Sequence, residues 1–243
     1  MGLASGTRRN MDISGRRVLV LGGSGVLGGL IAEELAKRGA TVALSGRDRE
    51  RLESAGSRIS PAAPHLIADL TEPDTPRRVV EWAAQTLGGL DGIVNAAGVI
   101  GFSTLAETDP ATVAEMVAVN LSAPLAVMGA AIPHLAGGFV VNLTGVVAER
   151  TVNGLVPYVA AKAGLSAALR SLAGELQRDG IQVLVVDARP PHTETGLAGR
   201  SISGTAPRYP EGLSPALVAR RVVDAIAAEE TEIPAAAFQA AGQ

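Results

Sequence analysis

The sequence of 243 residues lacks cysteine and is poor in aromatic residues, with one tryptophan, two tyrosines and three phenylalanines. Without cysteine, the chain can form neither a disulfide bond nor a thiolate metal site. Its three histidines, His65, His134 and His192, are too dispersed in the sequence to indicate a zinc cluster. We therefore expect that the function of this protein requires no metal ion.

The chain also lacks a strong net charge and a long uninterrupted apolar run. The net charge of -3 and the isoelectric point near 5.7 give no general electrostatic reason to bind nucleic acid or an acidic membrane. No apolar secretory region follows Arg8 and Arg9. The apolar stretch 114–133 is interrupted by polar residues and a proline, which favours a buried or interface helix over a membrane span. We expect a cytoplasmic protein that acts on a small molecule.

Apolar runs that are typical of β-strands alternate with helical patterns, which indicates an α/β fold with a parallel sheet covered on both faces. The length suits one domain at 13–243, a doubly wound Rossmann fold of about seven strands, after a flexible leader at 1–12 in which Met11 is an alternative start. The irregular stretch 190–213 is predicted to be a substrate loop. We expect strands at 17–21, 41–45, 64–67, 91–95, 138–143, 181–186 and 231–236, and helices at 26–38, 48–57, 74–87, 110–130, 157–178 and 214–229.

A glycine-rich segment lies between the first predicted strand and the first predicted helix. Residues Gly23 to Gly28 match the pattern G-x-G-x-x-G, in which glycines let the backbone approach a pyrophosphate at a helix N-terminus. The pattern alone is weak in a chain with 29 glycines. Its position between a strand and a helix predicts a dinucleotide site.

Tyr158 and Lys162 give a second signal, because the chain has only two tyrosines and two lysines. Four residues apart on a predicted helix, the phenol and the ammonium lie on one face, and a nearby cation lowers the pKa of a tyrosine. Such a pair can donate and accept a proton near neutral pH. A packed tyrosine beside a solvated lysine would be the better interpretation if the pair stood alone.

In their order along the chain, these motifs resemble those of the short-chain dehydrogenase/reductase family, over nearly the whole length from about Asp12. The matching pieces are the turn 22–28, Asp69-Leu70, Asn95-Ala96-Ala97-Gly98, Asn120, Tyr158 with Lys162, and Arg189-Pro190-Pro191-His192-Thr193-Glu194-Thr195. The resemblance implies that Tyr158 is the general acid/base and that Lys162 lowers its pKa and holds the nicotinamide ribose. It also implies that Asn120 supports a water in the proton relay.

The family pattern breaks at the catalytic serine, which usually lies 13 positions before the tyrosine, where this chain has Gly145. Thr144 is adjacent, and two alternatives remain open for it. Its hydroxyl substitutes for the serine, or the residue merely ends a strand and faces elsewhere. Asn142 and the backbone N–H of Gly145 are further candidate donors to a developing oxyanion.

Three other positions also depart from the family. Leu21 replaces the threonine that usually precedes the first glycine, and Val26 replaces the middle glycine, although Gly25 and Gly28 still relieve steric crowding. Pro191 stands where the family commonly has glycine. Because proline lacks an N–H and has a fixed φ, we expect altered contacts to the nicotinamide carboxamide.

The end of the second predicted strand indicates the choice of cofactor. An acidic residue there would hold both ribose hydroxyls of NAD, whereas a nearby arginine accommodates the 2′-phosphate of NADP. The chain has Ser45 followed by Arg47, so we expect NADP rather than NAD, with Asp48 interpreted as a helix N-cap. The predicted cofactor site comprises Gly22, Gly23, Ser24, Gly25, Val26, Leu27, Gly28, Ser45, Arg47, Asp69, Leu70, Asn95, Ala96, Ala97, Gly98, Tyr158, Lys162, Pro190, Thr193 and Thr195.

These observations predict an NADP-dependent oxidoreductase, a ketoreductase acting on a small, largely apolar carbonyl or alcohol. Its catalytic residues would be Tyr158, Lys162, Asn120 and Thr144, and its partner a second or further copy in a homodimer or homotetramer. The substrate pocket is expected at Val146, Val147, Asn153, Leu155 and the loop 192–212, with Tyr209 as an aromatic wall. An isomerase, dehydratase or imine reductase of the same fold, or a cofactor-sensing protein without turnover, remains an alternative.

Overall fold

The structure, a computed structural model, describes residues 10–240. Seven parallel strands form one sheet in the order β3-β2-β1-β4-β5-β6-β7, so the predicted doubly wound fold is confirmed. The order reverses between β1 and β4, and in such sheets ligands bind beyond the carboxyl ends of the strands at this point. The strands are β1 (Arg17–Leu21), β2 (Thr41–Gly46), β3 (His65–Ile67), β4 (Gly92–Asn95), β5 (Gly138–Leu143), β6 (Val183–Ala188) and β7 (Glu232–Ile233).

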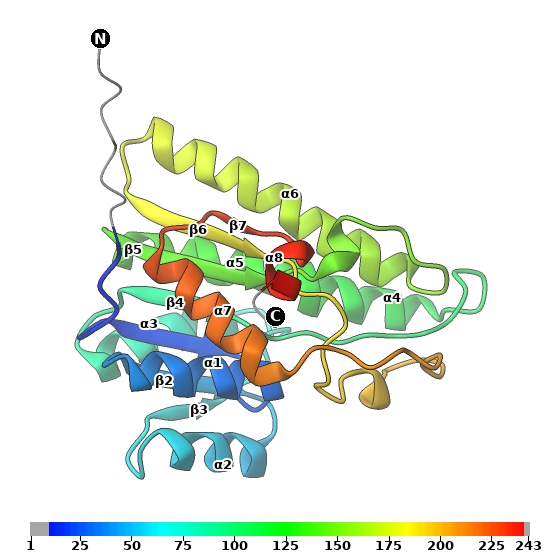
Figure 1. Cartoon of the computed structure of the whole chain (residues 1–243), viewed down its shortest axis with the longest axis horizontal. Coiled ribbons are helices and arrows are strands. Elements are labelled where there is room, and N and C mark those ends of the chain that lie inside the picture. The colour runs from blue at the N-terminus through cyan, green and yellow to red at the C-terminus, as the bar shows by residue number, and fades with distance from the viewer. Residues whose placement is uncertain (1–9, 241–243) are drawn as a thin grey trace.

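Helices cover both faces of the sheet (Figure 1). One face carries α1, α2, α7 and α8, while α3, α5 and α6 pack on the other, and α4 lies beside α6. The helices are α1 (Val26–Lys37), α2 (Arg49–Ile59), α3 (Thr75–Leu87), α4 (Pro110–Val117), α5 (Ala123–Ala131), α6 (Val156–Arg178), α7 (Pro215–Ala227) and α8 (Ala235–Ala240).

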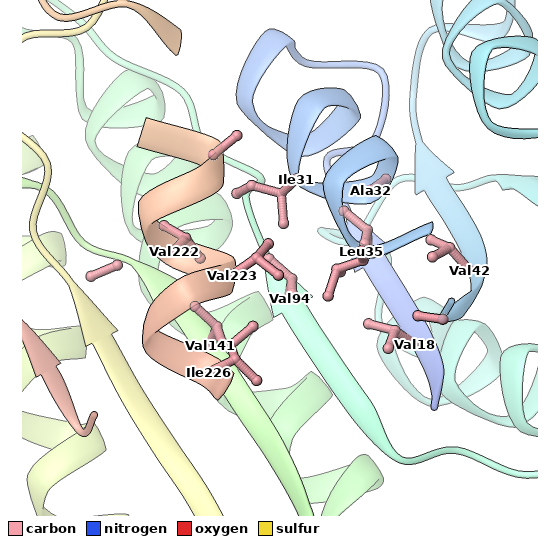
Figure 2. Packing of buried hydrophobic residues seen from close by; sticks show 14 of the residues in the cluster. Val18, Ile31, Ala32, Leu35, Val42, Val94, Val141, Val222, Val223 and Ile226 are labelled. Carbon is pink, nitrogen blue, oxygen red and sulfur yellow. The ribbon is translucent and has the colours of Figure 1, made fainter. Parts of the chain in front are cut away.

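The strands are apolar on both faces because each face is buried. Val18 and Val94 point toward Leu35 of α1 and Val223 of α7, as Figure 2 shows. The neighbouring strand residue Leu19 faces the opposite way, into the core formed with α3, α5 and α6. Each fully buried aliphatic side chain of this kind stabilises the fold by roughly 1.5–3 kcal/mol. This double burial holds the carboxyl ends of the strands in fixed positions.

Most boundaries differ from the sequence prediction by one or two residues, and three differences change the local structure. Strand β6 extends to Ala188 rather than ending at 186, so Asp187 lies inside the sheet, opposite Asn142 of β5. The strand predicted at 231–236 is only two residues long, and α8 begins just after Pro234. The helix predicted at 110–130 is interrupted by a π-helical turn at Ala118–Ser122.

The apolar segment Pro110–His134 is long and hydrophobic enough to cross a membrane by length and composition alone. In the structure its parts α4, the π-helical turn and α5 pack against α3 and α6. This arrangement agrees with the expected buried or interface helix. Of the predicted leader, residues 1–9 lie outside the described residues, while the backbone N–H of Met11 donates to the carbonyl of Ala227 at 2.8 Å.

Candidate cofactor and active site

A cavity of about 980 Å³ opens at the carboxyl end of the sheet, where the glycine-rich turn, several strand ends and the loop after β6 meet. Its volume is in the range of pockets that bind small molecules and cofactors. Gly23, Asn95 and Asn120 do not line it directly. The predicted site residues that line it are Gly22, Ser24, Gly25, Val26, Leu27, Gly28, Ser45, Arg47, Asp69, Leu70, Ala96, Ala97, Gly98, Thr144, Tyr158, Lys162, Pro190, Thr193 and Thr195.

The turn between β1 and α1 requires its outer glycines for packing. Gly22 has a φ of +72°, and a Cβ at this position would lie 2.5 Å from the backbone nitrogen of Ala97. A Cβ on Gly28 would lie 2.3 Å from the carbonyl oxygen of Gly22. Helix α1 begins after Gly25 with no side-chain cap and no acidic residue in its first turn. Its first N–H groups are therefore suited to bind an anion such as a pyrophosphate.

The end of β2 presents an unsatisfied polar group to the same cavity. Ser45 is buried, and its hydroxyl has no hydrogen-bond partner among the described residues. A buried hydroxyl without a partner is destabilising, so this position fits a polar group of a bound ligand. The Asp48 carboxylate accepts the backbone N–H of Arg51 at 3.0 Å. The interpretation of Asp48 as the cap of α2 is thus confirmed.

Three arginines line the cavity near this end, and only Arg47 was predicted. Its guanidinium lies 3.9 Å from the carboxylate of Asp69 and is half exposed. Arg200, from the loop after β6, has a lowered pKa because it is partly buried and because the positive charge of Arg51 repels its own. Two cations that repel one another across a cavity favour an anion between them. No sequence pattern placed Arg51 or Arg200, since their proximity arises from the docking of the loop.

Asp69 stays ionised at the cavity wall. Its carboxylate accepts the backbone N–H and the hydroxyl of Thr71 at 2.9 and 2.8 Å. Burial alone would raise the pKa of Asp69, but these hydrogen bonds and the charge of Arg47 lower it overall. The adjacent Leu70 lines the same wall.

The turn after β4 is held from behind by two buried asparagines. The amide of Asn95 donates to Asn142 at 2.9 Å across the sheet, and its oxygen accepts the backbone N–H of Ala97 at 3.3 Å. Asn142 is fully buried, donates to the sulfur of Met128 at 3.4 Å, and does not line the cavity. The suggestion that Asn142 donates to a substrate oxyanion is therefore not supported. The pair instead positions the cavity-lining residues 96–98.

Tyr158 and Lys162 lie on the cavity-facing side of α6, near its N-terminus. The Lys162 ammonium is 4% exposed, donates to the carbonyl of Leu143 at 2.8 Å and lies 5.9 Å from the centre of the Tyr158 ring. Burial lowers the pKa of Lys162 to about 8, although the charge of Asp187 opposes the shift. Burial raises the pKa of Tyr158 to about 12. The predicted lowering of the Tyr158 pKa by Lys162 is therefore wrong, because burial and the second tyrosine raise this pKa, and the phenol is protonated at neutral pH.

The Asn120 side chain holds nearby backbone segments in place and does not face the cavity. Its amide nitrogen donates to the carbonyls of Val99 and Met116, both at 2.9 Å, and its oxygen accepts the Val99 N–H at 3.3 Å. The residue lies in the π-helical turn, a distortion that occurs frequently at functional sites. Pro124, four residues further on, has no N–H to donate to the Asn120 carbonyl. Both the nitrogen and the oxygen of the side-chain amide are engaged in hydrogen bonds, so a contribution of Asn120 to a proton relay would come from its backbone.

The end of β5 offers no free hydrogen-bond donor at the position of the family's serine. The Thr144 hydroxyl donates to the carboxylate of Asp187, and the backbone N–H groups of Thr144 and Gly145 both donate to the carbonyl of Ala188. Gly145 has φ +81° and ψ 163°, a conformation that essentially only glycine adopts. Of the two alternatives for Thr144, this geometry favours the one in which its side chain faces elsewhere.

Asp187 is a buried carboxylate that the sequence did not single out, because it was expected beyond the end of β6. It is 3% exposed and accepts hydrogen bonds from the hydroxyl groups of Thr144 and, at 2.6 Å, of Ser166 in α6. The Nε atom of Arg189 lies 3.5 Å away, and this guanidinium also pairs with Glu149 at 2.7 Å. These hydrogen bonds connect the end of β5, β6 and α6, and the charge of Asp187 acts on Lys162 of the same helix. Its only sequence signal is an Asp-x-Arg pair in an apolar strand.

The loop after β6 closes the far side of the cavity. Its backbone pairs with the segment after β4, since Ile202 donates to Ile100 at 2.8 Å and Phe102 donates to Ser203 at 2.6 Å. Pro191 carries no N–H, and its carbonyl accepts the hydroxyl of Thr193 at 2.9 Å. Of the expected pocket residues outside the loop, Val146, Val147 and Leu155 line the cavity, whereas Asn153 does not.

The fold and the site together define a dinucleotide-binding Rossmann protein with a tyrosine and lysine pair at the carboxyl end of its sheet. The family model described as short chain dehydrogenase matches residues 16–204 of this sequence. The chain belongs to this family.

Individual relatives agree with this assignment. An uncharacterized oxidoreductase of Staphylococcus saprophyticus is 28% identical over 196 residues, which are 78% of this chain and 83% of that protein. A dehydrogenase/reductase of Sinorhizobium meliloti superposes with a TM-score of 0.80 at 27% identity, covering 93% of this chain and 97% of its own. A short chain dehydrogenase of Burkholderia cenocepacia in complex with NADP gives a TM-score of 0.80 at 26% identity, covering 93% and 98%.

Proposed function

We propose that this protein is a cytoplasmic, NADP(H)-dependent ketoreductase that acts on a carbonyl or alcohol group of a small, largely apolar metabolite. The observation that carries the proposal is that Tyr158 and Lys162 share one cavity with the uncapped N-terminus of α1. A bound nicotinamide cofactor supplies the hydride. The residues of this chain orient the reactants and supply the proton.

The ionisation of the two side chains favours reduction of a carbonyl. A phenol whose pKa is raised to about 12 by burial is protonated at neutral pH, so Tyr158 is suited to donate a proton to a carbonyl oxygen. Lys162, whose pKa is lowered to about 8, is still mostly charged at neutral pH. Its ammonium would hold the nicotinamide ribose, while the backbone around Asn120 supports a water that returns a proton to the phenol.

Charge at the end of β2 supports NADP rather than NAD. Ser45 provides an unpartnered hydroxyl instead of a carboxylate that would repel a phosphate. Arg47, Arg51 and Arg200 line this part of the cavity, and guanidinium groups bind phosphate through paired hydrogen bonds. The solved structure of the relative from Burkholderia cenocepacia is a complex with NADP.

The opposite part of the cavity supports a largely apolar substrate. Val146, Val147, Val152 and Leu155 line it, and Phe102 contributes an aromatic wall. Such a surface gains affinity by burying apolar area of the ligand, with orientation left to a few polar groups.

Gly145 gives specific support to a second candidate, in which the same fold and cofactor serve an isomerase, a dehydratase, an imine reductase or a cofactor sensor. A mixture of the protein with NADPH or NADH and a panel of ketones, aldehydes, quinones and imines distinguishes these functions. We expect loss of reduced-nicotinamide absorbance with ketones or aldehydes and a preference for NADPH. Consumption with imines alone, or tight binding of NADPH without any consumption, would support the second candidate.

A further inference from the structure

The site contains a second phenol, Tyr209, which belongs to the loop after β6. Both tyrosines of this chain line the same cavity. The Tyr209 ring is 39% exposed, so it is only partly covered by protein. The negative charge of an ionised Tyr209 would add to burial in raising the pKa of Tyr158. The Tyr209 phenol is thus a second hydroxyl group in the cavity that Tyr158 lines.

Tyr209 is held in place by aromatic neighbours and by the docked loop. Its ring stacks on His192 with 4.8 Å between centroids and 27° between planes, and lies 6.3 Å from the ring of Phe102. The His192 ring is fixed in turn by Glu194, whose carboxylate lies 3.4 Å from Nε2 and accepts the backbone N–H of Gly212 at 2.7 Å. The Tyr209 ring is thus held in place by contacts that involve residues from both ends of the loop.

Gly145 leaves the position of the family's serine side chain open. A Cβ on Gly145 would have only the Pro190 carbonyl and a methyl of Val147 near it, both at 3.8 Å. The donors of β5 that the sequence suggested are all engaged, since Thr144 bonds to Asp187 and the Gly145 N–H bonds to Ala188. A substrate oxygen beside Tyr158 thus needs its second hydrogen bond from another element.

We propose that the Tyr209 hydroxyl is this second donor, so that a tyrosine of the substrate loop takes the place of the serine on β5. The proposal rests on the proposed reductase function. In the reduction, Tyr158 releases its proton to the carbonyl oxygen as the hydride adds to the carbonyl carbon. Tyr209 keeps its proton and donates a hydrogen bond to the same oxygen, which stabilises the negative charge that develops there.

The chemistry also restricts the substrate. An oxygen held between two phenols beneath the aromatic wall of Phe102 and His192 fits a ketone or aldehyde with an apolar or aromatic substituent. A carboxylate substituent would have to be buried against this apolar wall, in a cavity that the Glu194 carboxylate also lines. We therefore expect neutral carbonyl compounds to be reduced better than keto acids of the same size.

The test compares Tyr209→Phe with the unmutated protein in NADPH-dependent reduction of the best carbonyl substrate. Tyr209→Phe keeps the stacking ring and removes only the hydroxyl. Loss of one oxyanion donor lowers turnover by about 10²–10³-fold, so we expect kcat to fall on this scale while KM and NADPH affinity change little. Phe102→Leu is the control, since it alters the aromatic wall without touching a hydroxyl and should act mainly on KM. An unchanged kcat in Tyr209→Phe would overturn the proposal.

A second measurement does not depend on turnover. Ring-fluorinated tyrosine incorporated into the chain ionises at lower pH and gives one ¹⁹F signal for each of the two tyrosines. We expect Tyr158 to titrate at lower pH in Tyr209→Phe than in the unmutated protein, because a neighbouring negative charge has been removed. An unchanged Tyr158 titration would show that the phenols do not interact and would overturn the proposal. Absence of any carbonyl reduction by the unmutated protein would instead contradict the proposed function.

Discussion

The two ends of the cavity use their polar groups in opposite ways. At the cofactor end, the N-terminus of α1 has no cap and the Ser45 hydroxyl has no partner among the described residues. At the substrate end, Thr144 and the N–H of Gly145 are already bonded to β6. The first end is thus prepared for a polar, anionic ligand, whereas the second is apolar and depends on very few hydroxyl groups. The contrast shows that two ends of one cavity can differ in how many polar groups they leave available to a ligand.

The largest expected effect is that of Tyr158→Phe. Removal of a general acid/base typically lowers turnover by at least about 10²-fold. NADPH affinity should be nearly unchanged, because the phenol acts at the substrate end. Steady-state kinetics combined with a fluorescence titration of NADPH measures both quantities. Nearly normal turnover in a correctly folded Tyr158→Phe protein would remove this residue from the mechanism.

Gly145→Ser tests whether the substrate end can be returned to the family pattern. The backbone conformation of Gly145 predicts a loss of stability of about 1–3 kcal/mol when another residue replaces glycine. We therefore expect a lower Tm and no gain in turnover. Gly145→Ala is the matched control, because it introduces the same strain without a hydroxyl, and a Gly145→Ser protein more active than both would contradict this account.

Thr144→Val separates a structural role from a catalytic one. The change removes a hydrogen bond to the buried Asp187 carboxylate, which should cost about 1–3 kcal/mol of stability. Because the hydroxyl faces Asp187, kcat should fall by less than tenfold, far less than in Tyr158→Phe. Ser166→Ala, which removes the other hydroxyl that donates to Asp187, should behave alike. A kcat loss of about 10²-fold in Thr144→Val alone would restore Thr144 as the substitute for the serine.

The cofactor end should respond to Arg47→Ala with a change in selectivity. A hydrogen-bonded contact between charged groups contributes about 1.5–3 kcal/mol, so the preference for NADPH over NADH should narrow by roughly tenfold or more. Parallel titrations with NADPH and NADH measure the difference between their affinities. Arg49→Ala is a control, since Arg49 lies on α2 and does not line the cavity. Tighter binding of NADH than NADPH by the unmutated protein would refute the choice of NADP.

The pH dependence should reflect Lys162 rather than Tyr158. As the pH rises through about 8, the buried ammonium loses its proton, so NADPH affinity and carbonyl reduction should decline, while Tyr158 stays protonated. The stability of the fold should instead increase as the pH rises. The folded-state pKa of Lys162 lies below its ordinary value, so above pH 8 the folded state binds fewer protons than the unfolded state, and this contribution to stability increases with pH. A pH profile of kcat/KM and of Tm, with Lys162→Met as the control that lacks both effects, checks the sign.

The smallest effects concern assembly, which we propose to be a homodimer or homotetramer through α5 and α6. Val156 of α6 and Leu125 of α5 are exposed apolar residues, 46% and 41% accessible. Their burial against a second copy would remove apolar surface from water. Light scattering at micromolar concentration should give a multiple of 24.6 kDa. A monomer mass would contradict the proposal.

Local patterns in the sequence predicted the architecture, and together with the family resemblance they predicted most of the cavity wall. The β1 and β5 strands have the predicted bounds, since apolar runs flanked by glycine are unambiguous there. The extension of β6 through Asp187 could not be predicted, because a carboxylate in a buried strand is unfavourable unless its partners are known. Those partners, Thr144 and Ser166, come from distant segments. The placement of Tyr209 in the cavity that Tyr158 lines likewise depends on how the loop docks.

Transfer of a deuteride is the most direct test of the central claim, which is that this cavity carries out NADPH-dependent carbonyl reduction through Tyr158. The unmutated protein is incubated with a ketone substrate and NADPH deuterated at the transferable position of C4, and the product is examined by mass spectrometry and NMR. The account predicts an alcohol that carries deuterium on the former carbonyl carbon, formed at least about 10²-fold more slowly by Tyr158→Phe. Conversion of the substrate without incorporation of deuterium would contradict it and would indicate an isomerase or dehydratase.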